Sequence, residues 1–289
     1  MNTFSKAFLF TSLFAAHSSW AQEARIEVFK AADDAIFPVT SELIIGQHEV
    51  LLVDAQFSSK DAQALVEKIQ ATGKPLKRIF ISNGDPDFYF GLDTITQAYP
   101  QAQVLATPAV VAHIKATKDH KLTTWAPALA EYAPKRLIVP TALTANQLEF
   151  EGQIIEILGT DSQTPERNIL WMPSLKTAFA GILVETGGHV WLADTASKAS
   201  RDTWRQQLQQ LAQLKPEQVI PSHFNGVRPN ANEALDFMQN YLQHAEAALA
   251  DQPKAATFIE RMKRHYPQLG GVESLELSAK VLTGEMQWQ

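Results

Sequence analysis

The stretch that decides the fold is IFISNGDPDFYFG, which occupies residues 79–91. It opens with the apolar run Ile79–Ile81, which is typical of a buried β-strand. Polar and turn-forming residues follow from Asn83 to Asp87, and the stretch closes at Gly91. A buried strand that runs directly into a polar loop predicts a functional loop held in place by a rigid sheet.

Short apolar strands alternate with amphipathic helices on both sides of this loop. The sequence predicts paired strands at Leu43–Ile45 and Val50–Val53, followed by a helix over residues 62–69, where apolar residues recur three and four positions apart. Five short strands are predicted between residues 137 and 180, beginning with Leu137–Val139 and separated by Gly and Pro turns. Helices that flank two β-rich layers predict an α/β (α+β) fold with four layers in the order αββα.

Residues 1–21 have the pattern of a secretory signal peptide. Lys6 precedes a short apolar run, and small residues before a predicted cleavage site after Ala21 complete the pattern. The run is shorter than the roughly 20 apolar residues that a membrane-spanning helix needs. We therefore expect a periplasmic or secreted protein with no membrane span in the mature chain. That chain is predicted to form one domain over residues 22–250, with a helical extension over residues 251–289 packed on it.

Composition and the absence of several motifs exclude whole classes of function. The formal net charge of −6 argues against a nucleic-acid partner, because phosphate binding needs clustered Lys and Arg. The chain has no cysteine, so any metal must be held by His, Asp, Glu, Asn or Gln. The sequence contains no G-x-S-x-G, S-x-x-K, G-x-G-x-x-G or phosphate-binding loop motif, and so gives no support to a serine hydrolase or a nucleotide-binding protein.

The loop over residues 83–91 resembles the H-x-H-x-D-H-x-x-G loop of the metallo-β-lactamase superfamily. Four further junctions follow in the family's order. Asp54 resembles its structural aspartate, and Gln163-Thr164-Pro165 resembles its H-T-P turn. Ala180-Gly181-Ile182 stands where the family has a G-D pair, and Pro221-Ser222-His223 resembles its final P-G-H. The resemblance spans about residues 26–230 and implies the αββα sandwich of that family.

The resemblance also implies a site for two zinc ions, most of whose ligands this sequence replaces. Where the family has three histidines at the first zinc, the chain has Asn83, Asp85 and Gln163. Amide oxygens suit hard cations such as calcium better than zinc, which favours imidazole and thiolate. Ile182 stands where the family has the aspartate that bridges the two ions, and an isoleucine cannot coordinate a metal.

The second zinc position keeps part of its ligand set. Asp87 and His223 are the residues that the family has there, whereas Phe88 replaces a histidine. Asp87 and His223 are therefore the candidate catalytic residues. Two interpretations stay open for them: a hydrogen-bonded pair that joins two loops, or a one-metal or acid–base site.

Aromatic residues near these junctions are candidates for binding a substrate. Phe88 and Tyr89 either line a pocket or pack in the core. The stretch that contains His189 and Trp191 resembles one found in small-molecule hydrolases of this fold, although a half-buried strand edge would explain it equally. The remaining histidines on predicted helices or loops are expected at the surface; they are His113, His120, His244 and His265.

Two functions follow from these residues. In the first, the protein has lost family-type dizinc hydrolysis, needs no cofactor, and binds a small organic ligand or a protein partner in the former active-site groove. In the second, it is a metal-dependent hydrolase of esters, lactones or β-lactams that uses one divalent ion of zinc, manganese or calcium. The ligands of that ion would be drawn from Asn83, Asp85, Asp87, Gln163 and His223.

Overall fold

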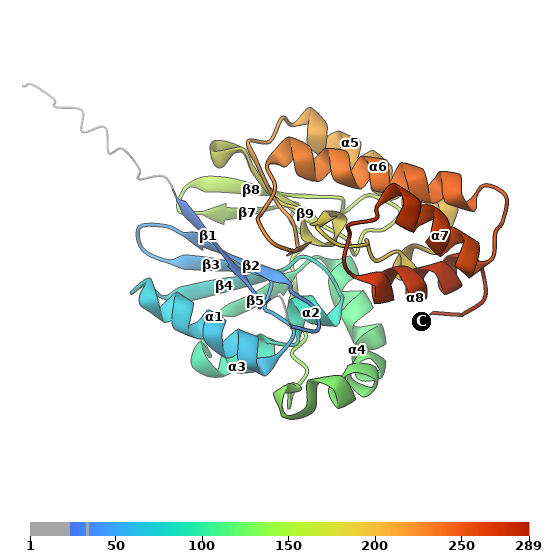
Figure 1. Cartoon of the computed structure of the whole chain (residues 1–289). Helices are drawn as coiled ribbons and strands as arrows, with labels where there is room; N and C mark the ends of the chain where they lie inside the picture. Colours follow the sequence, from blue (N-terminus) through green and yellow to red (C-terminus); the bar gives the residue numbers. More distant parts are fainter. Residues whose placement is uncertain (1–23, 33–34, 289) are drawn as a thin grey trace, which may run out of the picture.

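Two β-sheets pack face to face at the centre of the protein, and helices cover the outer face of each sheet (Figure 1). The structure is a computed structural model that describes residues 24–32 and 35–288. The predicted signal peptide lies outside the described residues. The four-layer αββα fold expected from the sequence is confirmed.

The first sheet has six strands that follow one another in sequence order. They are β1 (Arg25–Lys30), β2 (Thr40–Ile45), β3 (Val50–Val53), β4 (Leu76–Ile81), β5 (Gln103–Ala106) and β6 (Thr141–Ala142). The first three strands pair antiparallel, and the pairs from β3 to β6 are parallel. The outer helices of this half are α1 (Ser59–Ala71), α3 (Leu92–Ala98) and α4 (Pro108–Leu129).

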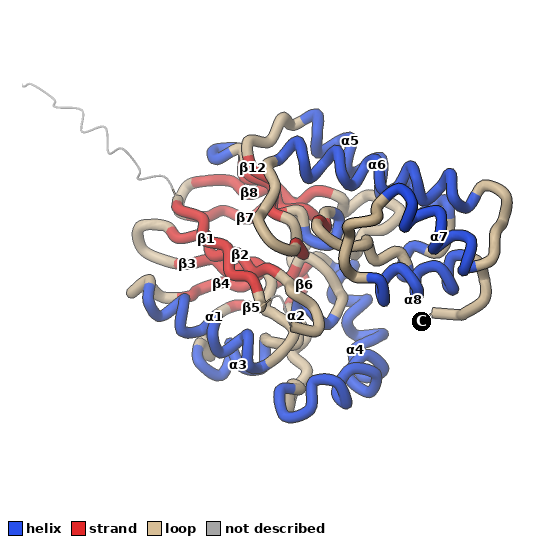
Figure 2. The backbone as a smooth tube through the Cα atoms, in the orientation of Figure 1, coloured by secondary structure: helices blue, strands red, loops and turns tan. Residues whose placement is uncertain are grey.

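The second sheet has five strands in the order β12-β10-β9-β8-β7. Their bounds are β7 (Gln147–Phe150), β8 (Gln153–Leu158), β9 (Ile169–Met172), β10 (Thr177–Phe179) and β12 (Gln218–Ile220). Helices α5 (Lys198–Gln213) and α6 (Ala231–Leu249) lie on its outer face (Figure 2). A separate two-stranded ribbon joins β11 (Glu185–Thr186) to β13 (His223–Phe224).

Apolar side chains alternate between the two faces of the central strands, which explains why the sheets pack against each other and against the helices. In β3, Leu51 and Val53 face the core between the sheets, whereas Val50 and Leu52 face the core under the helices. Successive side chains of a strand point to opposite faces of the sheet, so a strand made only of apolar residues is buried on both faces. Phe80 of β4 shares the inter-sheet core with residues of β7 to β10.

One predicted strand does not form. Leu137–Val139 is packed against the core but pairs with no strand among the described residues, and β6 begins only at Thr141. Pro140 lies between them and has no N–H to donate to a ladder, which explains why pairing with β5 starts after it.

The last two helices lie at one end of the protein, where α7 (Ala255–His265) packs against α6 and α8 (Val272–Leu282) packs against α7 (Figure 1). Phe258 and Leu275 are buried in the same core as Tyr241 of α6. This end of the chain therefore shares its core with the second sheet. No helix within residues 24–32 and 35–288 is long and apolar enough to cross a membrane.

Candidate functional site

A cavity of about 860 Å³ opens where loops from both halves of the protein meet. The loop after β4 contributes Asp85 and Asp87, and the β11–β13 ribbon contributes Glu185 and His223. Aromatic side chains from well-separated segments complete the walls; they are Phe37, Trp125, Trp191, Phe224 and Trp288.

Asp87 and His223 form an ion pair at this cavity, which brings together the two loops that the sequence singled out. The distance from His223 Nε2 to Asp87 Oδ2 is 2.9 Å, and His223 Nδ1 lies 2.8 Å from the Ser222 hydroxyl. Burial disfavours the charged imidazolium, but the hydrogen bond and charge of Asp87 outweigh it and raise the pKa of His223. Ser222 is buried and does not line the cavity, so it orients the ring and is not an accessible nucleophile.

Asp85 is paired with a lysine that the sequence did not suggest. Lys121 of α4 places its ammonium 2.5 Å from Asp85 Oδ1 and donates to His113 Nε2 at 3.2 Å. Burial would raise the pKa of Asp85, but Lys121 and then Arg167 outweigh it and hold that pKa below its ordinary value. The carboxylate of Asp85 is thus already neutralised by the chain itself.

His113 lies beneath the loop, and the expectation that it is a surface residue is wrong. It is half-buried, and burial together with Lys121 lowers its pKa, so the neutral ring accepts from the ammonium. A Cβ at Gly84 would lie 2.5 Å from His113 Cδ2. Gly84 is therefore required for the loop to lie against α4.

Asp54 joins the ends of two strands behind the cavity. It adopts a left-handed backbone conformation with φ of 59°, and its carboxylate accepts from the Ser82 N–H at 2.8 Å and from the Ser82 hydroxyl at 2.7 Å. Burial raises its pKa to about 7 although both hydrogen bonds act to lower it. These bonds fix the start of the loop over residues 83–91.

Three further acids of the cavity, Glu185, Asp194 and Glu273, were not found from the sequence. Glu185 accepts from the Trp191 main-chain N–H at 3.3 Å through Oε2, while its Oε1 is shielded from solvent and has no partner among the described residues. Burial raises the pKa of Glu185 to about 7. Asp194 accepts from two indole N–H groups, that of Trp191 at 2.5 Å and that of Trp288 at 2.8 Å. A single acid after the apolar run Ile182–Val184 was the only signal for Glu185.

Comparison with known proteins decides the family. The sequence matches the Metallo-beta-lactamase superfamily over residues 36–223. The chain belongs to the metallo-β-lactamase superfamily.

Solved structures share this fold. A metallo-beta-lactamase family protein from Thermus thermophilus aligns with a TM-score of 0.63 and 16% identity, over 89% of this chain and 91% of that one. The DIM-1 metallo-beta-lactamase aligns with a TM-score of 0.55 and 19% identity, over 78% of this chain and 99% of that one. Likenesses at these identities show the fold alone.

One curated protein also matches in sequence. YobT of Bacillus subtilis (strain 168), an uncharacterized protein, is 32% identical over 71 residues, which cover 25% of this chain and 30% of YobT. The match thus spans less than a third of that relative.

The residues at the superfamily's first zinc position do not fit a metal. Asn83 is buried, its Oδ1 accepts from the Asp85 N–H at 3.2 Å, and its Nδ2 has no partner among the described residues. Gln163 is exposed in the loop between β8 and β9 and does not line the cavity. Ile182, at the bridging position, presents an apolar side chain to the cavity.

At the second zinc position, a buried aromatic ring replaces one of the superfamily's ligands. The ring of Phe88 is fully buried in the core and packs edge-on to His223 with 6.0 Å between ring centroids. Within the described part of the chain, no three His, Cys, Asp or Glu residues lie close enough together to hold a metal ion. A superfamily zinc centre therefore does not fit these residues, because the two carboxylates left at its ligand positions, Asp85 and Asp87, are paired with Lys121 and His223.

The proposed substrate-binding aromatics divide into two groups. Phe88 and Tyr89 lie on the short helix α2 (Pro86–Tyr89), which turns them into the core and away from the cavity. His189 and Trp191 do line the cavity, although neither lies on a strand. The His189 ring is held by the Tyr241 hydroxyl, with 3.0 Å between Nδ1 and the oxygen.

Proposed function

We propose that this protein binds a small organic molecule in its 860 Å³ cavity and does so without a metal ion. One observation carries the proposal. The two carboxylates at the superfamily's ligand positions, Asp85 and Asp87, are each paired with a cation of the chain, Lys121 and His223. A metal would have to displace both cations, and it would then find an isoleucine and a phenylalanine at two further positions.

The size and lining of the cavity support a small-molecule ligand. Binding sites for such ligands are concave, largely apolar and commonly about 300–1,000 Å³ in volume, with few polar groups. This cavity falls in that range and combines aromatic walls with a small set of fixed charges. Family-type dizinc hydrolysis has no ligand set among the described residues, so we propose binding and not hydrolysis as the role of the fold.

Metal content tests the first half of the proposal. The full mature protein is equilibrated with zinc, manganese and calcium in turn, desalted, and measured by elemental analysis. We expect far less than one equivalent of each metal. Near-stoichiometric metal that is lost in the Asp87→Ala variant would overturn metal-independent binding and favour the single-metal hydrolase.

Ligand binding tests the second half. A library of small organic molecules is screened by ligand-observed NMR against the wild type and against Leu277→Trp, in which a larger side chain of α8 fills the cavity. Ile154→Trp is the matched control, because Ile154 lies exposed on β8 and away from the cavity. Hits should disappear in Leu277→Trp and persist in Ile154→Trp. A library without any such hit contradicts the proposal.

We also propose that the protein acts outside the cytoplasm, in the periplasm or as a secreted protein. The support is the signal-peptide pattern over residues 1–21. Intact mass of the protein recovered from a periplasmic or culture fraction should correspond to a chain that begins after Ala21. An uncleaved chain found with the cytoplasmic fraction would contradict export.

A further inference from the structure

We infer that the ligand of this cavity carries a positive charge, as a compact organic amine borne on an apolar body. The inference rests on the proposed function and adds the chemical class of the ligand. It comes from three separate features of the cavity: its unbalanced charge, an unpartnered carboxylate oxygen, and a pair of tryptophans held by an acid.

The charges along the cavity do not balance. Among the described lining residues, five are acids, namely Asp85, Asp87, Glu185, Asp194 and Glu273. The basic residues of the described lining are Lys121 and three histidines, His120, His189 and His223. Lys121 and His223 are each bonded to one of these acids, and burial lowers the pKa of His189, which favours its neutral form. Arg167 is buried and does not line the cavity, although its charge acts to lower the pKa of Asp85, Glu185 and Asp194. Burial raises the pKa of Glu185 and of Asp194, because neither acid is paired with a cation among the described residues, and a cationic ligand would stabilise their charged forms.

Glu185 offers a specific point of attachment. Its Oε1 is shielded from solvent and accepts no hydrogen bond from any described residue, although the side chain lines the cavity. A shielded carboxylate oxygen without a donor is costly, and burial accordingly raises the pKa of Glu185 to about 7. An ammonium group would supply both the missing donor and the opposite charge.

Asp194 and its two tryptophans form a second element of the site. The indole N–H groups of Trp191 and Trp288 donate to the two carboxylate oxygens, and the rings meet edge-on with 5.4 Å between centroids. Neutral indole groups satisfy the oxygens of Asp194 but supply no positive charge, and burial raises the pKa of Asp194, so a cation beside it would favour its charged form. Tryptophan rings beside an acid are the arrangement that attracts organic cations.

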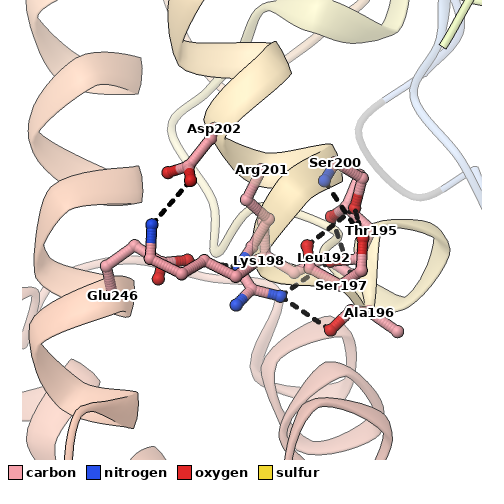
Figure 3. A network of polar contacts seen from close by, with 9 residues as sticks. All are labelled: Leu192, Thr195, Ala196, Ser197, Lys198, Ser200, Arg201, Asp202 and Glu246. Carbon is pink, nitrogen blue, oxygen red and sulfur yellow. Dashed lines mark hydrogen bonds and ion pairs between the residues drawn. The ribbon is translucent and has the colours of Figure 1, made fainter. Parts of the chain in front are cut away.

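The segment that carries Asp194 is firmly anchored. Arg201 of α5 donates to the main-chain carbonyl of Thr195 at 2.8 Å and to that of Ala196 at 2.9 Å, and it also pairs with Glu246 of α6 (Figure 3). The acid is thereby held beside the cavity by the helix layer. A preorganised charge of this kind binds its ligand with little reordering.

Another aromatic residue of the cavity already receives an ammonium group. Lys30 Nζ lies 5.1 Å from the ring centroid of Phe224, a lining residue. An anionic ligand would find Lys121 already engaged by Asp85 and His223 by Asp87. The site therefore discriminates by charge in favour of a cation.

A matched series of three probes tests the inference. Phenethylamine, phenethyl alcohol and phenylacetate share an aromatic body and differ in charge at its end. Isothermal titration of the full mature protein should give at least about tenfold tighter binding of the amine than of the alcohol, and the weakest binding for phenylacetate. Glu185→Gln should weaken amine binding by about tenfold and weaken alcohol binding much less, because the alcohol loses only a hydrogen bond to a charged acceptor.

The control removes a carboxylate elsewhere. Glu217→Gln breaks an exposed pair with Lys176, away from the cavity, and should leave every affinity unchanged. Binding of the alcohol or phenylacetate as tightly as the amine, in a manner blocked by Leu277→Trp, overturns the inference and leaves the proposed function standing. Failure of all three probes also overturns the inference, while the library screen decides the proposed function by itself.

Discussion

The ammonium of Lys121 lies 2.5 Å from the carboxylate of Asp85, at the position where the superfamily places a zinc ligand. A lysine from helix α4 thus neutralises a residue of the loop over 83–91, and the pair is largely buried, with 13% and 17% of the two side chains exposed. In the metal-free state that we propose, Lys121 supplies the positive charge beside Asp85 that a metal supplies elsewhere in the superfamily.

Breaking this pair should destabilise the protein. Lys121→Met leaves Asp85 buried beside fewer cations, which should raise the pKa of Asp85 and lower the free energy of unfolding by about 2 kcal/mol. The double variant Lys121→Met/Asp85→Asn should recover most of that loss, because it leaves no unpaired buried charge at this pair. Urea unfolding measures both. Equal losses in the single and double variants would show that packing, and not charge, accounts for the effect.

The close approach of Gly84 to His113 can be tested by a double-mutant cycle. Gly84→Ala places a methyl group against the His113 ring and should destabilise the protein by about 1–3 kcal/mol. His113→Ala removes the obstructing ring, so Gly84→Ala should cost much less in that background. Thermal unfolding of the four proteins in this cycle measures the coupling. Additive effects would mean that the loop avoids the clash in another way.

Stability should depend on pH through Asp54. Because burial raises its pKa to about 7, the folded protein holds a proton there that the unfolded chain releases from about pH 4 upwards. Its contribution is complete below about pH 4 and is lost as the pH rises through about 7. Asp54→Asn should therefore gain about 2 kcal/mol relative to wild type between about pH 5 and pH 8.

Denaturant titrations at several pH values measure this difference. Asp202→Asn, which alters an exposed acid of α5, should show no such trend. Glu185, whose pKa burial also raises to about 7, contributes in the same window, so Asp54→Asn should reduce the slope of the wild type without abolishing it. A difference between wild type and Asp54→Asn that does not change with pH would contradict the assignment.

How much the sequence could predict differs between the fold and the site. The fold was accessible because apolar strands, turns and the loop over 83–91 are local patterns. The Asp87–His223 pair was accessible too, because both residues occupy positions of a known motif. The roles of Lys121 and Trp288 could not be predicted, because neither residue belongs to a motif. Lys121 lines the cavity from helix α4, and Trp288 lines it from the segment after α8. Their roles depend on tertiary packing.

Rebuilding the superfamily's zinc ligands tests the register of the loops and the role of Lys121 together. One variant carries histidine at Asn83, Asp85, Phe88 and Gln163 and aspartate at Ile182. A second variant adds Lys121→Ala. We expect the second to bind zinc more tightly, because Lys121 otherwise places a positive charge beside the new ligands.

Titration with cobalt, followed through its visible absorption, and competition with zinc compare these two variants with the wild type. The wild type should give no absorption typical of tetrahedral cobalt. Equal zinc affinity in the two variants would show that Lys121 does not oppose a metal. Failure of both to bind would show that histidines at positions 88 and 163, whose native side chains do not line the cavity, cannot reach the other ligands, so that the resemblance assigns the wrong residues there.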